Sequence, residues 1–177
     1  MPDDSGGLHE RVTASERVYD GRIMNVRLDT VELADGRNAQ REVVEHAEVV
    51  AIVPVDAAGN VVLVRQYRLP AQDVLLEVPA GGVDEGESVD EAAQRELREE
   101  TGYRAATLER LGGFYVSPGY VTEFIHVFLA TDLSEDEEIE VVRMPLKKAV
   151  RLIETGGIKD GKSIIGLLLA AKTLASE

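Results

Sequence analysis

Runs of apolar residues along the chain predict a sheet-rich protein with a few helices. The two most continuous β-branched runs, residues 49–55 and 61–64, flank the turn sequence Ala58-Gly59-Asn60 and predict a buried hairpin in the central sheet. Shorter apolar runs predict further strands at residues 75–78, 114–116, 124–130 and 139–144. Because these strands are interleaved with helical segments, the pattern indicates a layered α/β fold.

The clearest helix signal begins at Ser88. Ser88 and Glu91 form the S-x-x-E pattern of a capping box, and Gly102 suits the left-handed position that ends a helix, so we predict a helix from Val89 to Gly102. Its buried stripe has helical spacing and comprises Val89, Ala92, Ala93 and Leu97. Two later helices are predicted over residues 146–154 and 163–174.

The N-terminal region has a weaker, two-sided pattern. Short strand patterns between residues 17 and 45 are separated by the turn sequences Asp20-Gly21 and Asp35-Gly36, which predicts a β-ribbon. Such a ribbon is marginally stable alone, so we expect it to pack on the main domain or on a partner subunit. The chain is thus divided into a flexible segment (residues 1–16), a ribbon (17–46) and a main domain (47–177).

Charge and amino-acid composition exclude or disfavour several classes of function. The 177 residues include 19 Lys and Arg against 33 Asp and Glu, giving a net charge of −14, which disfavours nucleic acid or membrane partners because both are polyanions. The lack of cysteine excludes a disulfide scaffold, a thiolate zinc site and a cysteine nucleophile. Residues 1–10 are polar, and no apolar stretch approaches the roughly 20 residues of a membrane span, so we expect a cytoplasmic protein.

Most of the negative charge lies in two short windows. Residues 84–100 contain eight acids and two bases, and residues 132–140 contain six acids and no base, so each window has a net charge of −6. A run of like charges usually forms a solvent-exposed face, and the spacing of the acidic residues shows whether they could instead bind a ligand. In the first window Glu96, Glu99 and Glu100 are three or four residues apart, which predicts three carboxylates on one helix face.

Like charges at this spacing destabilise a helix, so a divalent cation is expected to offset them. Mg²⁺ prefers carboxylate oxygens, and the glycines before the helix allow a backbone carbonyl such as that of Ala80 to approach the same ion. Arg95 lies four residues from both Glu91 and Glu99, so we expect it to bridge them and hold the ligands in place.

These residues carry a family resemblance. Gly81, Glu87 and the run Arg95-Glu96-Leu97-Arg98-Glu99-Glu100-Thr101-Gly102-Tyr103 resemble the Nudix box, the motif of Mg²⁺-dependent hydrolases of nucleoside diphosphates linked to another moiety. Every fixed position is filled, and the last place, usually aliphatic, is Tyr103. The resemblance implies a Nudix-type α/β/α sandwich with a mixed central sheet, a Nudix hydrolase domain over residues 47–177, and Mg²⁺ or Mn²⁺ as cofactor.

A second feature resembles one branch of this family. Pro118, sixteen residues beyond Gly102, is similar to the marker of the ADP-ribose pyrophosphatases, although an ordinary turn proline is the alternative interpretation. Residues 41–46, 64–68 and 77–81 also resemble that branch. The implied reaction is hydrolysis of ADP-ribose to AMP and ribose 5-phosphate by a homodimer whose N-terminal ribbons, the dimerisation arms, exchange strands.

Alternative functions stay open. The protein is alternatively a Nudix pyrophosphatase whose substrate is a nucleoside diphosphate sugar, a dinucleotide or an oxidised nucleoside diphosphate instead of ADP-ribose. A non-catalytic nucleotide sensor is disfavoured because every box glutamate is present. A calcium-binding module is disfavoured because the loop over residues 132–140 lacks the glycine that an EF-hand turn requires.

The resemblance also implies roles for individual residues. The Ala80 carbonyl, Glu96, Glu99 and Glu100 are the expected metal ligands. In this branch an acid from a loop after the main sheet orients the attacking water, which makes Glu137 the first candidate and Glu138 and Glu140 the alternatives, while other members use a box glutamate such as Glu99 or Glu100. Arg41 and Arg68 are candidates for phosphate and ribose contacts because a guanidinium recognises phosphate at two points, and the alternative is that they are ordinary surface or strand-edge charges. The resemblance places Ser117 and Glu123 in the same pocket, with Glu123 contacting either the substrate or a neighbouring subunit. We interpret His46 and His126 as packing residues, since nothing has zinc-ligand spacing.

Overall fold

The protein is described by a computed structural model covering residues 9–176, and its internal contacts divide it into two units. The smaller unit comprises residues up to Ala47 together with Tyr115–Phe124, and the larger unit comprises Glu48–Phe114 and the chain from Ile125 onward. The sequence places the corresponding boundary before residue 47. It does not predict that the loop containing Ser117 and Glu123 belongs with the ribbon.

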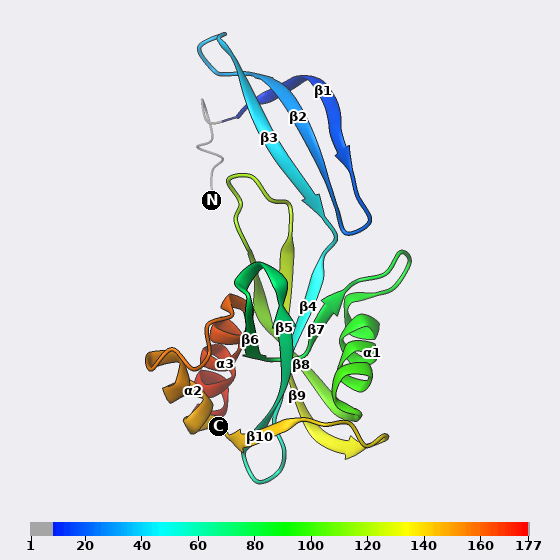
Figure 1. The fold of residues 1–177 in the computed structure, drawn as a ribbon, viewed down its shortest axis with the longest axis vertical. Helices are drawn as coiled ribbons and strands as arrows, with labels where there is room; N and C mark the ends of the chain where they lie inside the picture. The colour runs from blue at the N-terminus through cyan, green and yellow to red at the C-terminus, as the bar shows by residue number, and fades with distance from the viewer. Residues whose placement is uncertain (1–8, 177) are drawn as a thin grey trace. The chain divides into compact units, whose positions relative to one another are not determined.

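The smaller unit is built on an antiparallel sheet of order β1-β2-β3 (Figure 1), formed by β1 (Arg11–Asp20), β2 (Met24–Glu32) and β3 (Asn38–His46). Strand β1 begins at Arg11, so the expectation of a flexible segment up to residue 16 is wrong for residues 11–16, and residues 1–8 lie outside the described part. The pairing of Arg11 with Glu32 and the Ser15 hydroxyl, which donates to Asp29 over 2.6 Å, hold this polar strand in place.

The loop Tyr115–Phe124 is joined to the end of β3 by backbone hydrogen bonds. The amide of Val44 donates to the carbonyl of Tyr120 over 2.7 Å, and the amide of Thr122 donates back to the carbonyl of Val44 over 3.0 Å. The rings of Tyr115 and Phe124 close the base of the loop in an edge-to-face contact with centroids 4.9 Å apart. The loop is therefore an integral part of the smaller unit.

The larger unit contains two sheets. One has the order β7-β4-β9-β8 and is formed by β4 (Val49–Pro54), β7 (Ala80–Gly82), β8 (Tyr103–Tyr115) and β9 (Phe124–Glu135). The other has the order β10-β5-β6 and is formed by β5 (Asn60–Arg68), β6 (Asp73–Glu77) and β10 (Val142–Pro145), with a 3₁₀ turn at Leu69–Ala71. Strand β4 runs parallel to β9 and antiparallel to β7, so the central sheet is mixed, as predicted.

The predicted hairpin between the two β-branched runs is wrong. Strands β4 and β5 belong to different sheets and share only an isolated bridge between Val55 and Val61. Both runs are buried, so the apolar pattern reports burial correctly. It does not identify the partner, because β4 pairs with a strand more than 70 residues further along the chain.

Helices cover both faces of the sheets in this unit (Figure 1): α1 (Val89–Thr101) lies on one side, and α2 (Leu146–Glu154) and α3 (Gly161–Leu174) lie on the other. Every residue of strand β4 is buried, and because successive side chains point to opposite faces of the sheet, the strand is covered on both faces. Val49, Ala51 and Val53 join the core under α2 and α3, whereas Val50 and Ile52 join the core under α1. The predicted α/β/α sandwich is confirmed.

Both ends of α1 form as predicted. The Ser88 hydroxyl accepts a hydrogen bond from the Glu91 amide, and the Glu91 carboxylate accepts one from the Ser88 amide over 2.9 Å. At the other end Gly102 has a φ of 74°, and an added Cβ would lie 1.9 Å from the carbonyl oxygen of Glu137. Gly102 is therefore required both by its conformation and by the close approach of the acidic loop.

No helix within residues 9–176 is long and apolar enough to cross a membrane.

Candidate active site

Glu100 lies where α1 meets the central sheet. One of its carboxylate oxygens accepts a hydrogen bond from the Gln66 side chain over 2.7 Å, and the other accepts one from the Ala80 amide over 3.0 Å. Burial raises the pKa of Glu100 above its usual range, and the nearby carboxylate of Glu96 raises this pKa further. The site therefore holds a carboxylate whose charge is only partly compensated by its neighbours.

Arg95 holds the acids around Glu100 in a fixed arrangement. Its guanidinium makes a two-point contact with Glu87 over 2.9 and 2.8 Å, and it also reaches Glu96 at 2.5 Å and Glu99 at 3.5 Å. The predicted contact with Glu99 is confirmed. The predicted contact with Glu91 is wrong, because the Glu91 carboxylate is engaged in the capping box.

Gly81 allows β7 to approach the Glu96 side chain. A Cβ added at Gly81 would lie 2.1 Å from the carboxyl carbon of Glu96, far inside van der Waals contact. The neighbouring Gly82 has open space at the same position, with no atom within 4 Å of an added Cβ. The glycine of the box is therefore needed at residue 81, where the backbone faces a carboxylate.

A second polar cluster surrounds Glu77, whose side chain is 1% exposed at the end of β6. The Arg68 guanidinium donates to both Glu77 oxygens, over 2.8 and 2.7 Å, and the Lys162 ammonium donates to one of them over 2.5 Å. Burial alone would raise the pKa of Glu77, but the hydrogen bonds from Arg68 and Lys162 outweigh it and lower this pKa. Glu77 is therefore a buried carboxylate held in its charged form.

Sequence reasoning missed Gln66, Glu77 and Lys162. One signal was available for Lys162: a lysine in the first turn of a helix lies at the positive end of the helix dipole, where an acid is favoured. Glu77, at the end of an apolar strand pattern, was a similar signal, because an isolated acid in such a position is buried and needs a partner.

The site residues predicted from sequence are divided between the two units. Arg68, Ala80, Glu96, Glu99, Glu100 and Glu137 lie in the larger unit, whereas Arg41, Ser117 and Glu123 lie in the smaller unit. Within the smaller unit, Arg41 pairs with Glu10, its Nε lying 2.9 Å from a Glu10 oxygen, and Glu123 lies 3.8 Å from the Nδ1 atom of His46. The larger unit thus holds all the predicted metal ligands and Arg68.

The acidic loop that carries Glu137 is attached to the end of α1. The amides of Asp136 and Glu137 both donate to the carbonyl of Gly102, over 2.8 and 3.1 Å, and the Asp136 carboxylate accepts from Arg104 over 3.0 Å. The side chains of Glu137, Glu138 and Glu140 are exposed. The loop is therefore fixed by its backbone two residues beyond Glu100, while its acids face solvent.

The donor set of α1 fits a divalent cation in its chemistry. Glu96, Glu99 and Glu100 are hard oxygen donors on one helix face, and the pKa of Glu100 is raised mainly by burial and further by the nearby Glu96 carboxylate. The three carboxylates do not point to one centre, since Arg95 holds Glu96 and Glu99 while Glu100 faces Gln66 and Ala80. Correspondingly, within residues 9–176 no three acidic or imidazole side chains are arranged as a metal cage.

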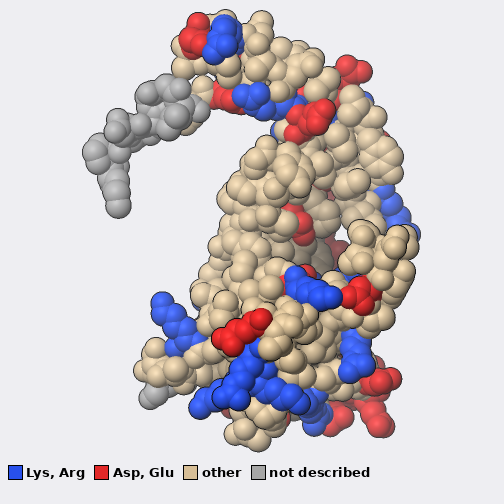
Figure 2. Space-filling model, turned by 60° about the vertical axis from the view of Figure 1, so that its left-hand side comes forward, with Lys and Arg blue, Asp and Glu red and all other residues tan. Residues whose placement is uncertain are grey.

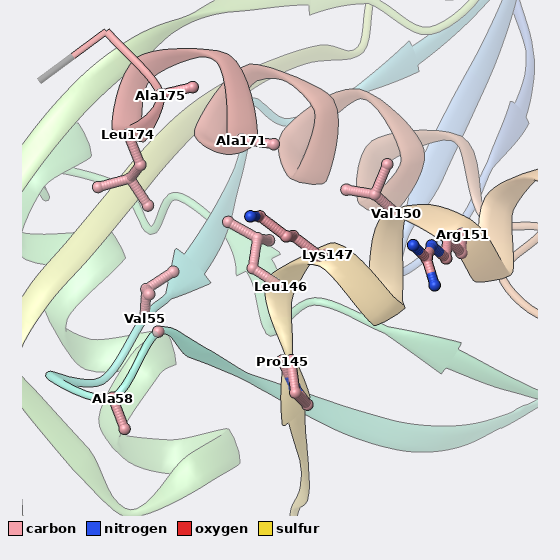
Figure 3. Close-up of a pocket in the computed structure, with 11 residues that line it drawn as sticks. Val55, Ala58, Pro145, Leu146, Lys147, Val150, Arg151, Ala171, Leu174 and Ala175 are labelled. Carbon is pink, nitrogen blue, oxygen red and sulfur yellow. The ribbon is translucent and has the colours of Figure 1, made fainter.

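A cavity of about 740 Å³ lies elsewhere in the larger unit, between the turn after β4, the start of α2 and the end of α3 (Figure 3). Its lining is apolar except for Lys147 and Arg151, and it includes none of the predicted site residues. Basic side chains also gather toward the lower end of the face drawn in Figure 2. The carboxylates of α1, and not this cavity, are therefore the candidate active site.

Comparison with known proteins identifies the family of the chain. The model of the NUDIX domain matches residues 37–163, and the model of the nucleoside diphosphate sugar hydrolase N-terminal domain matches residues 10–44. An ADP-ribose pyrophosphatase of Bacillus subtilis (strain 168) is 38% identical over 165 residues, covering 88% of this chain and 89% of the relative. A methanol dehydrogenase activator of Bacillus methanolicus is 35% identical over 169 residues, covering 90% of this chain and 91% of the relative.

The fold is also similar to a solved structure. A crystal structure of an ADP compounds hydrolase superposes with a TM-score of 0.84 and 28% identity, covering 94% of this chain and 95% of that one. The NUDIX model spans well over half of the chain and includes every box residue from Gly81 to Tyr103. The chain belongs to the Nudix family.

Proposed function

We propose that this protein hydrolyses the pyrophosphate bond of ADP-ribose, yielding AMP and ribose 5-phosphate, with Mg²⁺ as the metal and Mn²⁺ as a possible substitute. The observation that carries the proposal is the carboxylate face of α1, with Glu100 partly buried beside Glu96 and both held by neighbouring groups. The similarity to an ADP-ribose pyrophosphatase over 88% of the chain supports the choice of substrate.

Members of this family generally use a divalent metal. Glu96, Glu99, Glu100 and the Ala80 carbonyl would hold it, and it would neutralise charge on the pyrophosphate oxygens and lower the pKa of a bound water. Arg95 restrains the side chains of Glu96 and Glu99 from one side. Gln66 restrains Glu100, and because the three carboxylates do not point to one centre, their side chains would have to turn toward a bound metal.

Two sets of groups complete the proposed site. Glu137 accepts a proton from the attacking water, with Glu138 and Glu140 as the alternatives on the same loop. Arg68 binds a phosphate group of the substrate, because a guanidinium recognises phosphate at two points.

Arg41, Ser117 and Glu123 of the smaller unit are proposed as further substrate-binding residues. Its ribbon is proposed to serve as the dimerisation arm of a homodimer.

A second substrate class is favoured by one specific observation. The match of residues 10–44 to the N-terminal domain of nucleoside diphosphate sugar hydrolases supports a nucleoside diphosphate sugar as substrate. Both candidates share the pyrophosphate linkage and differ in the group beyond it. The box chemistry therefore applies equally to each.

The test is product analysis with ADP-ribose and Mg²⁺, followed by kcat/KM across ADP-ribose, nucleoside diphosphate sugars, dinucleotides and an oxidised nucleoside diphosphate. We expect AMP and ribose 5-phosphate as products and the highest kcat/KM for ADP-ribose. Glu100→Gln should abolish turnover while leaving the circular dichroism spectrum unchanged. A clear preference for another substrate would overturn the ADP-ribose assignment, and full activity of Glu100→Gln would overturn the proposed site.

The loop acid has its own test. Glu137→Gln should lower kcat by about 10² to 10⁴, the range for losing a general base. Glu135→Gln, a change to an exposed acid at the end of β9, is the matched control and should retain activity. If Glu138→Gln or Glu140→Gln causes the loss instead, the base is reassigned to that residue.

A further inference from the structure

We propose that Lys162 is a positioning residue that sets the orientation of the Arg68 guanidinium through the buried carboxylate of Glu77. The inference rests on the proposed function in one respect, the role of Arg68 in binding a phosphate group of the substrate. It adds a residue from α3, remote in sequence from the Nudix box.

The Glu77 carboxylate is shared between two cations. One of its oxygens accepts from Arg68 Nε over 2.8 Å, and the other accepts both from Arg68 Nη2 over 2.7 Å and from Lys162 Nζ over 2.5 Å. Without Lys162, the Glu77 carboxylate would be held only along the edge that faces Arg68. The additional bond from Lys162 restrains the carboxylate, and hence the two-point contact with Arg68, in a single orientation.

Lys162 is itself held rigidly. Its side chain is 12% exposed, and its ammonium lies 2.9 Å from the Asp160 carboxylate, which also caps the start of α3 by accepting from the Ser163 amide over 3.0 Å. A cation in the first helical turn is disfavoured by the helix dipole. The position of Lys162 therefore serves the contact with Glu77 and not the stability of α3.

The arrangement leaves part of Arg68 available. Its Nε and Nη2 atoms are engaged with Glu77, and its side chain is 42% exposed. The Nη1 edge of the guanidinium is not used by Glu77 and is the edge that we assign to the substrate. A guanidinium fixed in this way binds an anion without first losing its own rotational freedom.

The charges of the cluster balance. Arg68 and Lys162 carry two positive charges, and Glu77 and Asp160 carry two negative charges. Removing the Lys162 ammonium frees the Glu77 carboxylate to turn, so the loss of a fixed Arg68 orientation predicts weaker binding of an anionic substrate. The loss should therefore fall mainly on KM and less on kcat.

The experiment is a double-mutant cycle on ADP-ribose hydrolysis with Mg²⁺. Lys162→Met should raise KM about tenfold, within the range found for residues that orient a ligand-binding group, with kcat changed much less. Lys159→Met removes the exposed Lys159–Asp73 pair before the same helix and should leave both constants unchanged. In an Arg68→Gln background, Lys162→Met should change KM by no more than a factor of about two.

Three outcomes would overturn the proposal. Full additivity of the two substitutions would mean that Lys162 acts on the substrate directly. A lowered melting temperature with unchanged KM would mean that Lys162 is only structural. An effect of Lys159→Met equal to that of Lys162→Met would mean that general surface charge is responsible.

Two further measures keep the test decisive. If Lys162→Met does not fold, Lys162→Gln retains a hydrogen-bond donor without the charge and is expected to raise KM in the same way; an unchanged KM in folded Lys162→Gln would count against the proposal. If the wild-type protein does not hydrolyse ADP-ribose, the proposed function fails by itself. The same cycle is then run on whichever nucleoside diphosphate derivative it hydrolyses, where non-additivity still supports the inference and additivity still refutes it.

Discussion

Gly81→Ala tests the geometry of the carboxylate site with a single methyl group. The added Cβ would lie 2.1 Å from the carboxyl carbon and from one oxygen of Glu96, and 2.3 Å from its other oxygen. Ordinary contact begins near 3.4 Å, so the Glu96 carboxylate must move by more than an ångström. Arg95 holds that carboxylate at 2.5 Å, so the movement also disturbs the contact with Arg95.

A displacement of about 1 Å in a catalytic arrangement costs on the order of 10² in rate. We therefore expect Gly81→Ala to lower kcat/KM about 100-fold at saturating Mg²⁺. The free energy of unfolding should change much less, because the atoms that must move are the far end of the flexible Glu96 side chain. Steady-state kinetics and urea denaturation measure the two effects separately.

Gly82→Ala is the matched control, because its added Cβ meets no atom within 4 Å. It should leave kcat/KM close to the wild-type value. Wild-type activity in Gly81→Ala would refute the argument that Glu96 must stay where it is. Equal losses in the two variants would show that the glycines matter for backbone freedom and not for the approach to Glu96.

Three further changes test other parts of the structure. Gly102 has a φ of 74°, and an added Cβ would lie only 1.9 Å from the Glu137 carbonyl oxygen, whereas Gly86 has a φ of 83° and open space around the same position. In urea denaturation, Gly86→Ala should lower the free energy of unfolding by about 1 kcal/mol, and Gly102→Ala should lower it clearly more. Equal losses would contradict the close approach of the Glu137 carbonyl. Because the folded-state pKa of Glu77 is lowered, its stabilisation is present above the unfolded pKa of about 4.3 and is lost as pH falls through the folded pKa. Unfolding measured from pH 6 to 3 should show this loss, Glu77→Gln should flatten it, and an unflattened profile would count against the assignment. Mg²⁺ should raise the melting temperature of the wild type but not of Glu100→Gln, since binding to the folded state alone stabilises it; an equal rise in both would remove Glu100 from the ligand set.

The helix α1 was predictable from sequence because several independent local signals agree. The capping box, the apolar stripe and the terminal glycine each point to the same 13-residue segment, which the structure forms from Val89 to Thr101. Each of these signals lies within a few residues of the helix end or helix face that it determines. The box residues on the helix are therefore also placed correctly on one face.

Edge strands were much harder to predict. Strand β8 extends from Tyr103 to Tyr115 at the edge of its sheet, whereas the apolar pattern predicts a strand only at residues 114–116. Strand β1 is exposed along its whole length and contains two register shifts, which break the two-residue period. Edge strands carry polar side chains, so hydrophobic alternation underreports them.

Long-range pairing limits what sequence reveals about the site. Glu77 and Lys162 are 85 residues apart, and the α3 turn that brings them together has no motif that names its partner. The same limit produced the wrong partner for β4. Local patterns predict burial and secondary structure, whereas strand order and the meeting of distant charges depend on tertiary packing.

The two acidic windows, residues 84–100 and 132–140, have the same net charge, but their side chains have different surroundings in the fold. In the second, Asp132 accepts from Thr107 and Asp136 from Arg104, and the remaining acids face solvent. In the first, Arg95 is shared among Glu87, Glu96 and Glu99, whereas Glu91 caps the helix and Glu100 contacts Gln66 and Ala80.

The internal cations near Glu100 are already committed. Arg68 and Lys162 are balanced by Glu77 and Asp160, and Arg95 carries one charge against three carboxylates. If the substrate binds there as proposed, the negative excess at Glu96, Glu99 and Glu100 has to be neutralised from outside the chain before an anionic pyrophosphate can bind. In the proposed mechanism a divalent cation would supply that charge with the oxygen chemistry these ligands offer, so we expect affinity for an anionic substrate only when the metal is also present.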